Sequence, residues 1–269
     1  MDTLAVNKKR LQRLTIVSGA GYGLSLIGMQ ALWYKNSERQ SFRFFNDNAE
    51  WKQIDKLGHF YSAFYFSYGA SAALRWCNMP AKKSDAIGAL TGLLIMVPVE
   101  IFDGFSAAYG ASTGDLIANT AGSAFFLGQK SLWGEVRLIP KLSFHRSAFA
   151  DERPDILGAT LISEVFKDYN GHTLWLAADM DKFVRFPRWL NLAVGYGAND
   201  MVYARDHQNA DFGFSSYRQY YVSLDFDLTA IQTRSKFLRT ILLVASAIKI
   251  PAPTVEFSRK KVLWHPLYF

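Results

Sequence analysis

Four long stretches in the first half of the chain carry almost no charge, which limits the chain to folds that bury helices in protein or in lipid. The longest stretch, Thr15 to Tyr34, has no charged residue, and three shorter ones cover about residues 60–74, 86–99 and 116–129. About twenty apolar residues cross a bilayer as a helix, so only the first stretch is long enough by itself. The shorter ones are rich in Gly, Ala and Ser, which favours the close helix contacts of membrane proteins. We therefore expect about four apolar membrane helices.

Two alternatives remain open for these stretches. The three shorter ones also have the length of buried helices in a soluble domain. The first stretch follows a basic cluster and therefore also fits a secretory signal, although no A-x-A cleavage site follows it. We favour a helix that is retained in the mature protein.

The sequence pattern changes after Gly134. In this second half of the chain, residues 220–228 alternate between apolar or aromatic side chains and mostly polar ones. This alternation predicts a strand with one apolar face and one face in water. The apolar face would hold Tyr220, Val222, Leu224, Phe226 and Leu228, and the wet face Tyr221, Ser223, Asp225 and Asp227. Weaker strand patterns lie at 135–145 and 189–200, helical spacing at 155–167 and 234–249, and an extended proline-containing stretch at 250–257.

The predicted fold class is mainly α. A polytopic helical membrane bundle would occupy residues 1–134, and a mixed α/β region residues 135–269. The single cysteine, Cys77, excludes an internal disulfide and a site built from several thiolates.

The net charge of +7 does not come from a nucleic-acid surface, because no basic run with interleaved aromatic residues is present. The basic residues instead form clusters beside apolar stretches, at 8–13, 75–83 and 259–261. Lys and Arg are retained on the cytoplasmic side of membranes, so the first two clusters predict a four-span arrangement that starts in the cytoplasm.

Polar residues gather at the ends of the last three apolar stretches. If these stretches are consecutive antiparallel spans, the start of the second, the end of the third and the start of the fourth lie on the outer side. Residues three or four apart share one face of a helix, so each end presents its polar groups together. The predicted ligand-binding residues in this layer are Asp55, Lys56, His59, Glu100, Asp103, Asp115 and Asn119.

Each ionisable group near hydrocarbon costs about 2.5 to 3.5 kcal/mol at mid-membrane, and two basic groups cannot neutralise four acids. We therefore expect a cation, a water-filled pocket or a protonated carboxyl in this layer. Structural roles remain open for several residues: Asp55 and the segment 112–115 are suited to capping helices, and His59 to packing. Glu100 and Asp103 fit capping less well, because acids at the C-terminal end of a helix oppose its dipole.

A histidine with carboxylates also suits a metal-assisted hydrolase. Zinc sites usually contain more than one His or Cys, however, and no HExxH, P-loop, G-x-S-x-G or dinucleotide motif is present. We assign no catalytic residue, favour a non-enzymatic role, and expect no cofactor except the divalent metal that the hydrolase alternative requires.

The motifs DKLGHF, VEIFDGF and STGDLIANTAG resemble those of VanZ-like membrane proteins over about residues 44–125. The chain is still more similar to the YfiM-like family of predicted bacterial lipoproteins and envelope proteins. The positions that carry the resemblance are Asp55, Lys56, His59, Glu100, Asp103, Asp115, Asn119 and Gly122. The chain departs from these families in two ways: no cysteine follows the first apolar stretch, and the C-terminal half lies outside the VanZ-like pattern. The resemblance implies a bacterial envelope protein concerned with lipid or cell-wall metabolism, and it supplies no reaction.

Three functions are therefore open. The favoured one is an envelope membrane protein whose polar pocket at the membrane boundary recognises a lipid headgroup or a cell-wall component. The others are a metal-assisted membrane hydrolase and an outer-membrane or envelope assembly component. The expected partners are membrane lipids and envelope proteins, without nucleic acid, and we favour the inner over the outer membrane.

Overall fold

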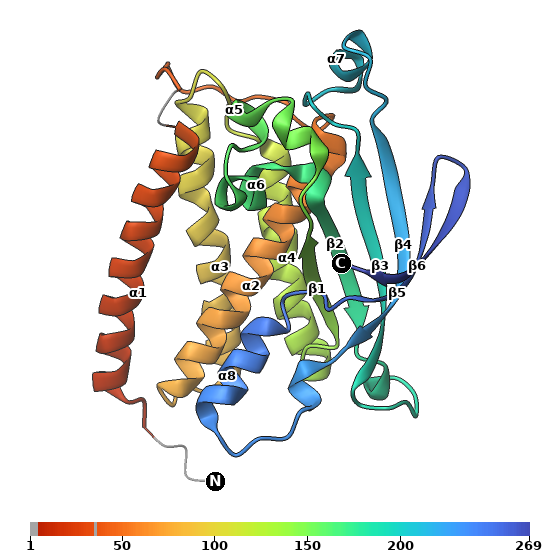
Figure 1. Ribbon diagram of the computed structural model, residues 1–269. Helices are drawn as coiled ribbons and strands as arrows, with labels where there is room; N and C mark the ends of the chain where they lie inside the picture. The colour runs from red at the N-terminus through yellow and green to blue at the C-terminus, as the bar shows by residue number, and fades with distance from the viewer. Residues whose placement is uncertain (1–4, 35–36) are drawn as a thin grey trace. The chain divides into compact units, whose positions relative to one another are not determined.

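The computed structural model describes residues 5–34 and 37–269, which form two compact units (Figure 1). The first unit comprises Met1–Asn48 and Gly58–Glu135, and the second comprises Ala49–Leu57 and Val136–Phe269. The first turn of helix α2 is counted with the second unit, although the helix itself is continuous.

The first unit is built from long helices at the positions of the four apolar stretches. They are α1 (Lys8–Met29), which a π-helical turn (Gln30–Tyr34) continues, α2 (Ile54–Trp76), α3 (Ala81–Gly104) and α4 (Thr113–Trp133). Ser112 caps α4, because its side-chain oxygen accepts a hydrogen bond from the backbone N–H of Asp115. Gly134 ends the same helix in the left-handed conformation, with φ of 74°.

Small residues let α2, α3 and α4 approach closely. A Cβ atom at Gly122 of α4 would collide with the backbone oxygen of Phe60 on α2. A Cβ atom at Gly92 of α3 would meet both the side chain of Ser67 and, at 2.7 Å, the backbone oxygen of Ala63 on α2. The Gly, Ala and Ser content seen in the sequence therefore serves helix packing.

The predicted polytopic membrane bundle is wrong. Among the described residues only α3 is long and apolar enough to cross a membrane, and core helices and signal sequences meet the same criterion. The prediction treated a lack of charge as apolarity. The stretch from Thr15 to Tyr34 contains four glycines together with Thr, Ser and Gln, and α2 and α4 carry many hydroxyl and amide side chains. The inside–outside topology depends on the same four spans, so that prediction is wrong as well.

The second unit is a six-stranded antiparallel sheet in which neighbouring strands follow one another in sequence. The strands are β1 (Leu138–Phe144), β2 (His172–Ala178), β3 (Leu190–Asn199), β4 (Tyr217–Phe226), β5 (Ala252–Ser258) and β6 (Lys261–Tyr268). Short helices connect them: α5 (Pro154–Leu157), α6 (Leu161–Lys167), α7 (Asp206–Asp211) and α8 (Lys236–Ala245).

Most predicted elements of this unit are confirmed: β1, β3, β4, β5 and α8 lie where the patterns placed them. The predicted helix at 155–167 is split into α5 and α6 by Gly158, whose φ is 109°. Strands β2 and β6 were not predicted. The sequence of β2, HTLWLAA, is rich in Leu and Ala and lacks an alternating pattern, so nothing marked it as a strand.

The sheet is inverted relative to the predicted wet face of β4. Tyr221, Ser223 and Asp225 are buried, whereas Tyr220 and Val222 are 52% and 49% exposed. The buried face of the sheet therefore carries its polar side chains, and its other face is apolar and open. Aromatic side chains still form a core on the buried face, where Trp175 packs on Tyr221 with ring centroids 5.5 Å apart.

A buried ion cluster lies on the inner face. Lys141 Nζ lies 2.6 Å from Asp225 Oδ2, and both side chains are essentially inaccessible. Lys249 Nζ lies 4.0 Å from the other carboxylate oxygen and donates a hydrogen bond of 2.7 Å to the carbonyl of Leu224. Burial lowers the pKa of Lys249 to about 8, although Asp225 opposes this shift. Three charges thus replace part of the apolar core expected under a sheet.

Candidate functional site

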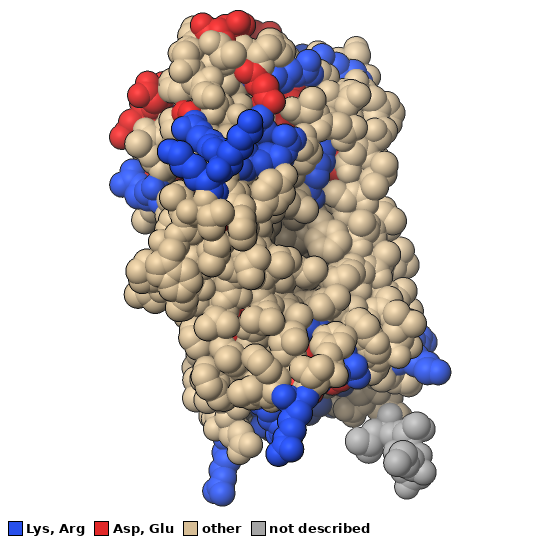
Figure 2. Space-filling model, turned by 90° about the vertical axis from the view of Figure 1, so that its right-hand side faces the viewer, with Lys and Arg blue, Asp and Glu red and all other residues tan. Residues whose placement is uncertain are grey.

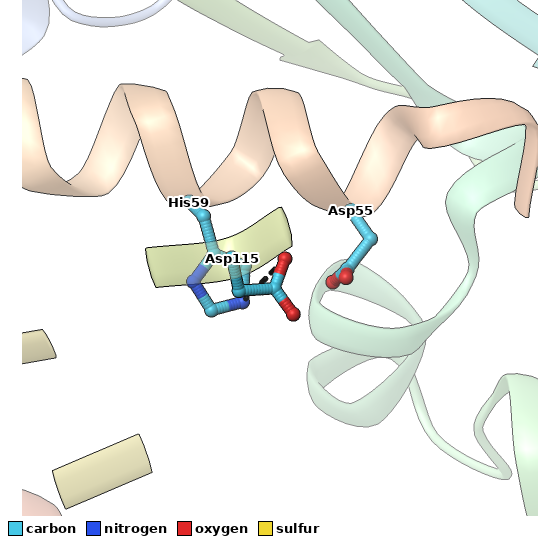
Figure 3. Close-up of side chains that lie close together, drawn as sticks. All are labelled: Asp55, His59 and Asp115. Atoms are coloured by element: carbon cyan, nitrogen blue, oxygen red, sulfur yellow. Dashed lines mark ion pairs between the residues drawn. The ribbon is translucent and has the colours of Figure 1, made fainter. Parts of the chain in front are cut away.

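The candidate site centres on His59, one turn into α2. Asp55 and His59 lie four residues apart on this helix, and in Figure 3 His59 faces Asp115, the first acidic residue of α4. His59 Nε2 lies 3.9 Å from Asp115 Oδ1. The helical spacing of α2 and the capped start of α4 therefore set this pair.

Two more polar residues meet His59 from the neighbouring helices. Glu100, in the last turns of α3, places Oε1 3.7 Å from His59 Nδ1. Asn119, one turn after Asp115, places Oδ1 3.1 Å from the same nitrogen. Glu100, Asp115 and Asn119 are 3%, 4% and 1% exposed. Four of the predicted residues thus form one buried cluster, which we call the His59 cluster.

The hydrogen bond to Asn119 fixes how His59 is protonated when neutral. Asn119 Oδ1 can only accept, so Nδ1 carries the hydrogen and Nε2 keeps a lone pair. That lone pair faces Asp115 across a distance too long for a hydrogen bond. His59 Nε2 and Asp115 Oδ1 therefore lie near each other, and a bound cation or a proton on His59 would stabilise the pair.

Glu100 has an unusual carboxyl group. The backbone N–H of Ser112 donates to its Oε2 at 3.0 Å, and within the described residues Oε1 accepts no hydrogen bond. Burial raises the pKa of Glu100 from 4.5 to about 7, with further upward contributions from Asp115 and Asp103 and opposing ones from His59 and Ser112. Glu100 is thus poised to take up or release a proton near neutral pH.

The other three predicted residues lie outside the His59 cluster. Asp103, one turn after Glu100, accepts a 2.7 Å hydrogen bond from the Tyr34 hydroxyl. Asp55 accepts one of 2.8 Å from the hydroxyl of Tyr169 and lies 3.1 Å from Lys56 Nζ. The hydrogen bond to Tyr34 and the ion pair with Asp55 give Asp103 and Lys56 structural roles, and no ligand is needed to explain them.

Ser112 and Asp47 are parts of the site that the sequence did not identify as such. The Ser112 hydroxyl donates to Asp47 Oδ1 at 2.6 Å, while its backbone binds Glu100 and its oxygen caps α4. The capping role was one of the open alternatives, but the link to Glu100 joins residues twelve apart and has no local signal. Asp47 lies in a loop with no periodic pattern, so nothing marked it.

Among the described residues, the two best-defined hollows include no residue of the His59 cluster, so the predicted polar pocket has no support there. Two surface hollows in the described part of the chain are mainly apolar. One is lined by Leu26, Ile27, Gln30, Ala31 and Phe102, and the other by Leu116, Ile117, Thr120 and Ala121.

The donor atoms fit a small divalent cation. Two ligand atoms bound at about 2.1 Å to one ion lie at most about 4.2 Å apart, so His59 Nε2 and Asp115 Oδ1 can share an ion without moving. One ligand atom each from Asp55, His59 and Asp115 lies within 4.8 Å of the others, so a third ligand needs only a small side-chain movement. One imidazole with carboxylates suits Mg²⁺, Mn²⁺ or Zn²⁺.

Comparison with known proteins identifies one similar family. Residues 43–128, about a third of the chain, match the family described as "Predicted periplasmic lipoprotein (DUF2279)". The chain matches no curated protein and no solved structure. The matched segment contains all seven predicted site residues, and it supports the expectation of a bacterial cell-envelope protein associated with a membrane.

Proposed function

We propose that this chain is a bacterial cell-envelope protein whose helical unit binds a divalent cation at the His59 cluster and uses it to hold an anionic group, such as a lipid phosphate. The observation that carries the proposal is the pair His59 Nε2 and Asp115 Oδ1. These atoms face each other at 3.9 Å, while Asn119 keeps the imidazole hydrogen on the opposite nitrogen.

Charge explains why a cation comes first. Glu100 and Asp115 give the cluster an excess of negative charge over the single imidazole, and this excess would repel a phosphate directly. A bound divalent ion reverses the sign at the site and can bridge the carboxylates to a phosphate oxygen. The side chain of His59 is 14% exposed, which leaves a path for an incoming group.

The resemblance to VanZ-like and YfiM-like proteins fits this proposal. The residues that carry it include His59, Glu100, Asp115 and Asn119, and Gly122, whose lack of a side chain lets α4 approach α2. We propose that the shared motif builds this cluster. The preference for the inner over the outer membrane stays a prediction, as does the division of the chain into domains 1–134 and 135–269.

The test is calorimetric titration of the purified full chain with Mn²⁺, Mg²⁺ and Zn²⁺. We expect one ion per chain, and no measurable binding in Asp115→Asn or His59→Ala. Asn119→Ala, which loses only the group that orients the imidazole, should weaken the affinity about 10–100-fold.

The matched control is Asp85→Asn. Asp85 is also a buried acid of the first unit, but it pairs with Arg75 at 2.6 Å and lies outside the His59 cluster. Circular dichroism checks that each variant folds. Binding that is absent in the wild type, or that survives in His59→Ala and Asp115→Asn, would refute the proposal.

A metal-assisted hydrolase is the second candidate, and the position of Glu100 favours it, because its Oε1 lies 3.7 Å from His59 Nδ1. A carboxylate so close to a metal site would be suited to act as a general base toward a water molecule. Hydrolysis of a phosphate ester that requires the metal and is lost in Glu100→Gln would establish this function. Metal binding without hydrolysis would support the first candidate, a protein that binds a cation and uses it to hold an anionic group.

A further inference from the structure

The second unit carries an exposed apolar surface on the outer face of its sheet. Six side chains on β3 to β6 form it, each between 44% and 66% exposed. We call it the outer patch: Val194, Tyr220, Val222, Phe257, Val262 and Trp264.

Strand register makes the outer patch continuous. Val194 lies opposite Val222, and Val222 opposite Val255, which in turn lies opposite Trp264. A parallel row joins Tyr220 to Phe257 and Phe257 to Val262. Directly opposed residues share one face of a sheet, so the two rows lie side by side, the first over β3 to β6 and the second over β4 to β6. Contiguous apolar surfaces of this kind mark contacts with proteins or membranes.

Aromatic and basic side chains border the outer patch at both strand ends. At one end, Trp189 stacks on Phe226 with ring centroids 6.1 Å apart, and exposed Arg185 and Arg188 lie in the preceding loop. At the other end lie Arg218 and the β5–β6 turn. On the side that carries these strands, Figure 2 shows a broad uncharged band, with Lys and Arg beside Asp and Glu above it and mainly Lys and Arg below it.

We propose that the outer patch rests on an anionic lipid bilayer, with its apolar centre against the acyl chains and its aromatic and basic borders among the headgroups. Tyr and Trp prefer this interface, and Lys and Arg near an anionic surface add attraction. This inference does not depend on the His59 cluster.

Charge favours the lipid over a second copy of the chain. In a symmetric face-to-face dimer the outer patch would meet itself, and the exposed Arg side chains beside it, Arg185, Arg188 and Arg218, would lie against their own copies or against each other. The open edge of the sheet at β6 also limits the depth, because unpaired backbone groups are not tolerated in hydrocarbon. The contact is therefore a surface contact of the sheet face.

The test places a fluorophore on the outer patch. Cys77 is the only cysteine, so Cys77→Ser followed by Val222→Cys gives a single site for an environment-sensitive dye such as NBD. The control is Ile162→Cys on α6, which is 70% exposed in the same unit but outside the outer patch. The full chain is mixed with vesicles of phosphatidylglycerol and phosphatidylethanolamine.

We expect the emission at position 222 to shift to the blue and brighten with vesicles, while position 162 stays unchanged. No response at 222, or an equal response at both positions, overturns the proposal. A blue shift without lipid, together with a doubled mass in light scattering, overturns it in favour of a second copy. If the cysteine-free chain does not fold, vesicle flotation of Val222→Glu against Ile162→Glu decides, and equal flotation of the two overturns the proposal.

Discussion

At the scale of single residues, Glu100 most clearly separates a functional from a structural site. Its carboxyl group is buried at the C-terminal end of α3, where the helix dipole disfavours a negative charge. Capping explains Ser112 and pairing explains Asp103, but neither explains Glu100. A buried acid of this kind is typical of a functional site that transfers a proton or binds a cation.

Glu100 should make stability depend on pH. Folding raises its pKa from 4.5 to about 7, so the folded state holds the proton more tightly than the unfolded state. The resulting stabilisation is complete below about pH 4.5 and is lost as the pH rises to 7, a change of about 3 kcal/mol. Glu100→Gln should remove this part of the pH dependence, measured by denaturant unfolding in chelator.

Asp179 adds to the pH dependence of stability in the same range, because burial also raises its pKa to about 7. Asp179→Asn is therefore the matched control: its own contribution should vanish while that of Glu100 remains. If Glu100→Gln leaves the pH profile unchanged, Glu100 is ionised in the folded protein and the account of its environment fails.

At the scale of elements, the helix contacts were more predictable than the sheet. His59, Glu100, Asp115 and Asn119 could be expected to meet, because helical spacing and antiparallel neighbours bring helix ends together. The alternation in β4 predicted a strand but not which side is buried, because a period of two is the same for both faces. Lys141 and Lys249 on the inner face had no signal, since each finds its partner Asp225 only through the fold.

The contact of α4 with α2 gives a prediction with an internal control. In Gly122→Ala the new methyl group must displace the Phe60 backbone, which should cost about 1–3 kcal/mol. Gly128→Ala lies on the same helix with open space around it, and it should stabilise by up to about 1 kcal/mol through helix propensity. Urea unfolding followed by helical circular dichroism measures both. Equal effects of the two changes would show that α4 does not pack as described.

The buried ion cluster of Lys141, Lys249 and Asp225 gives a second prediction about stability. Asp225→Asn leaves the ammonium of Lys141 buried without its counter-charge, so we expect a loss of about 3–5 kcal/mol in stability. Adding Lys141→Met should recover part of that loss, because the second change removes the stranded charge. Thermal unfolding of the single and double variants checks this, and a double variant less stable than Asp225→Asn would contradict it.

At the scale of the whole molecule, the chain combines a helical unit that carries a polar cluster with a sheet unit whose exposed face is apolar. Both features suit a protein of the cell envelope, as the family match over residues 43–128 supports. The sequence predicts four membrane spans only if an uncharged stretch is equated with an apolar one, and here the two differ. The sequence could not reveal which face of the sheet is exposed, because the partners that bury Trp175 and Tyr221 come from strands far apart in the chain.

The most direct test of the central claim is a crystal of the full chain grown with Mn²⁺ and measured for anomalous scattering. We expect one anomalous peak in the helical unit, within about 2.2 Å of His59 Nε2 and of an Asp115 oxygen. A map without a peak there, or a peak held by other residues while His59 bonds directly to Asp115, would contradict it.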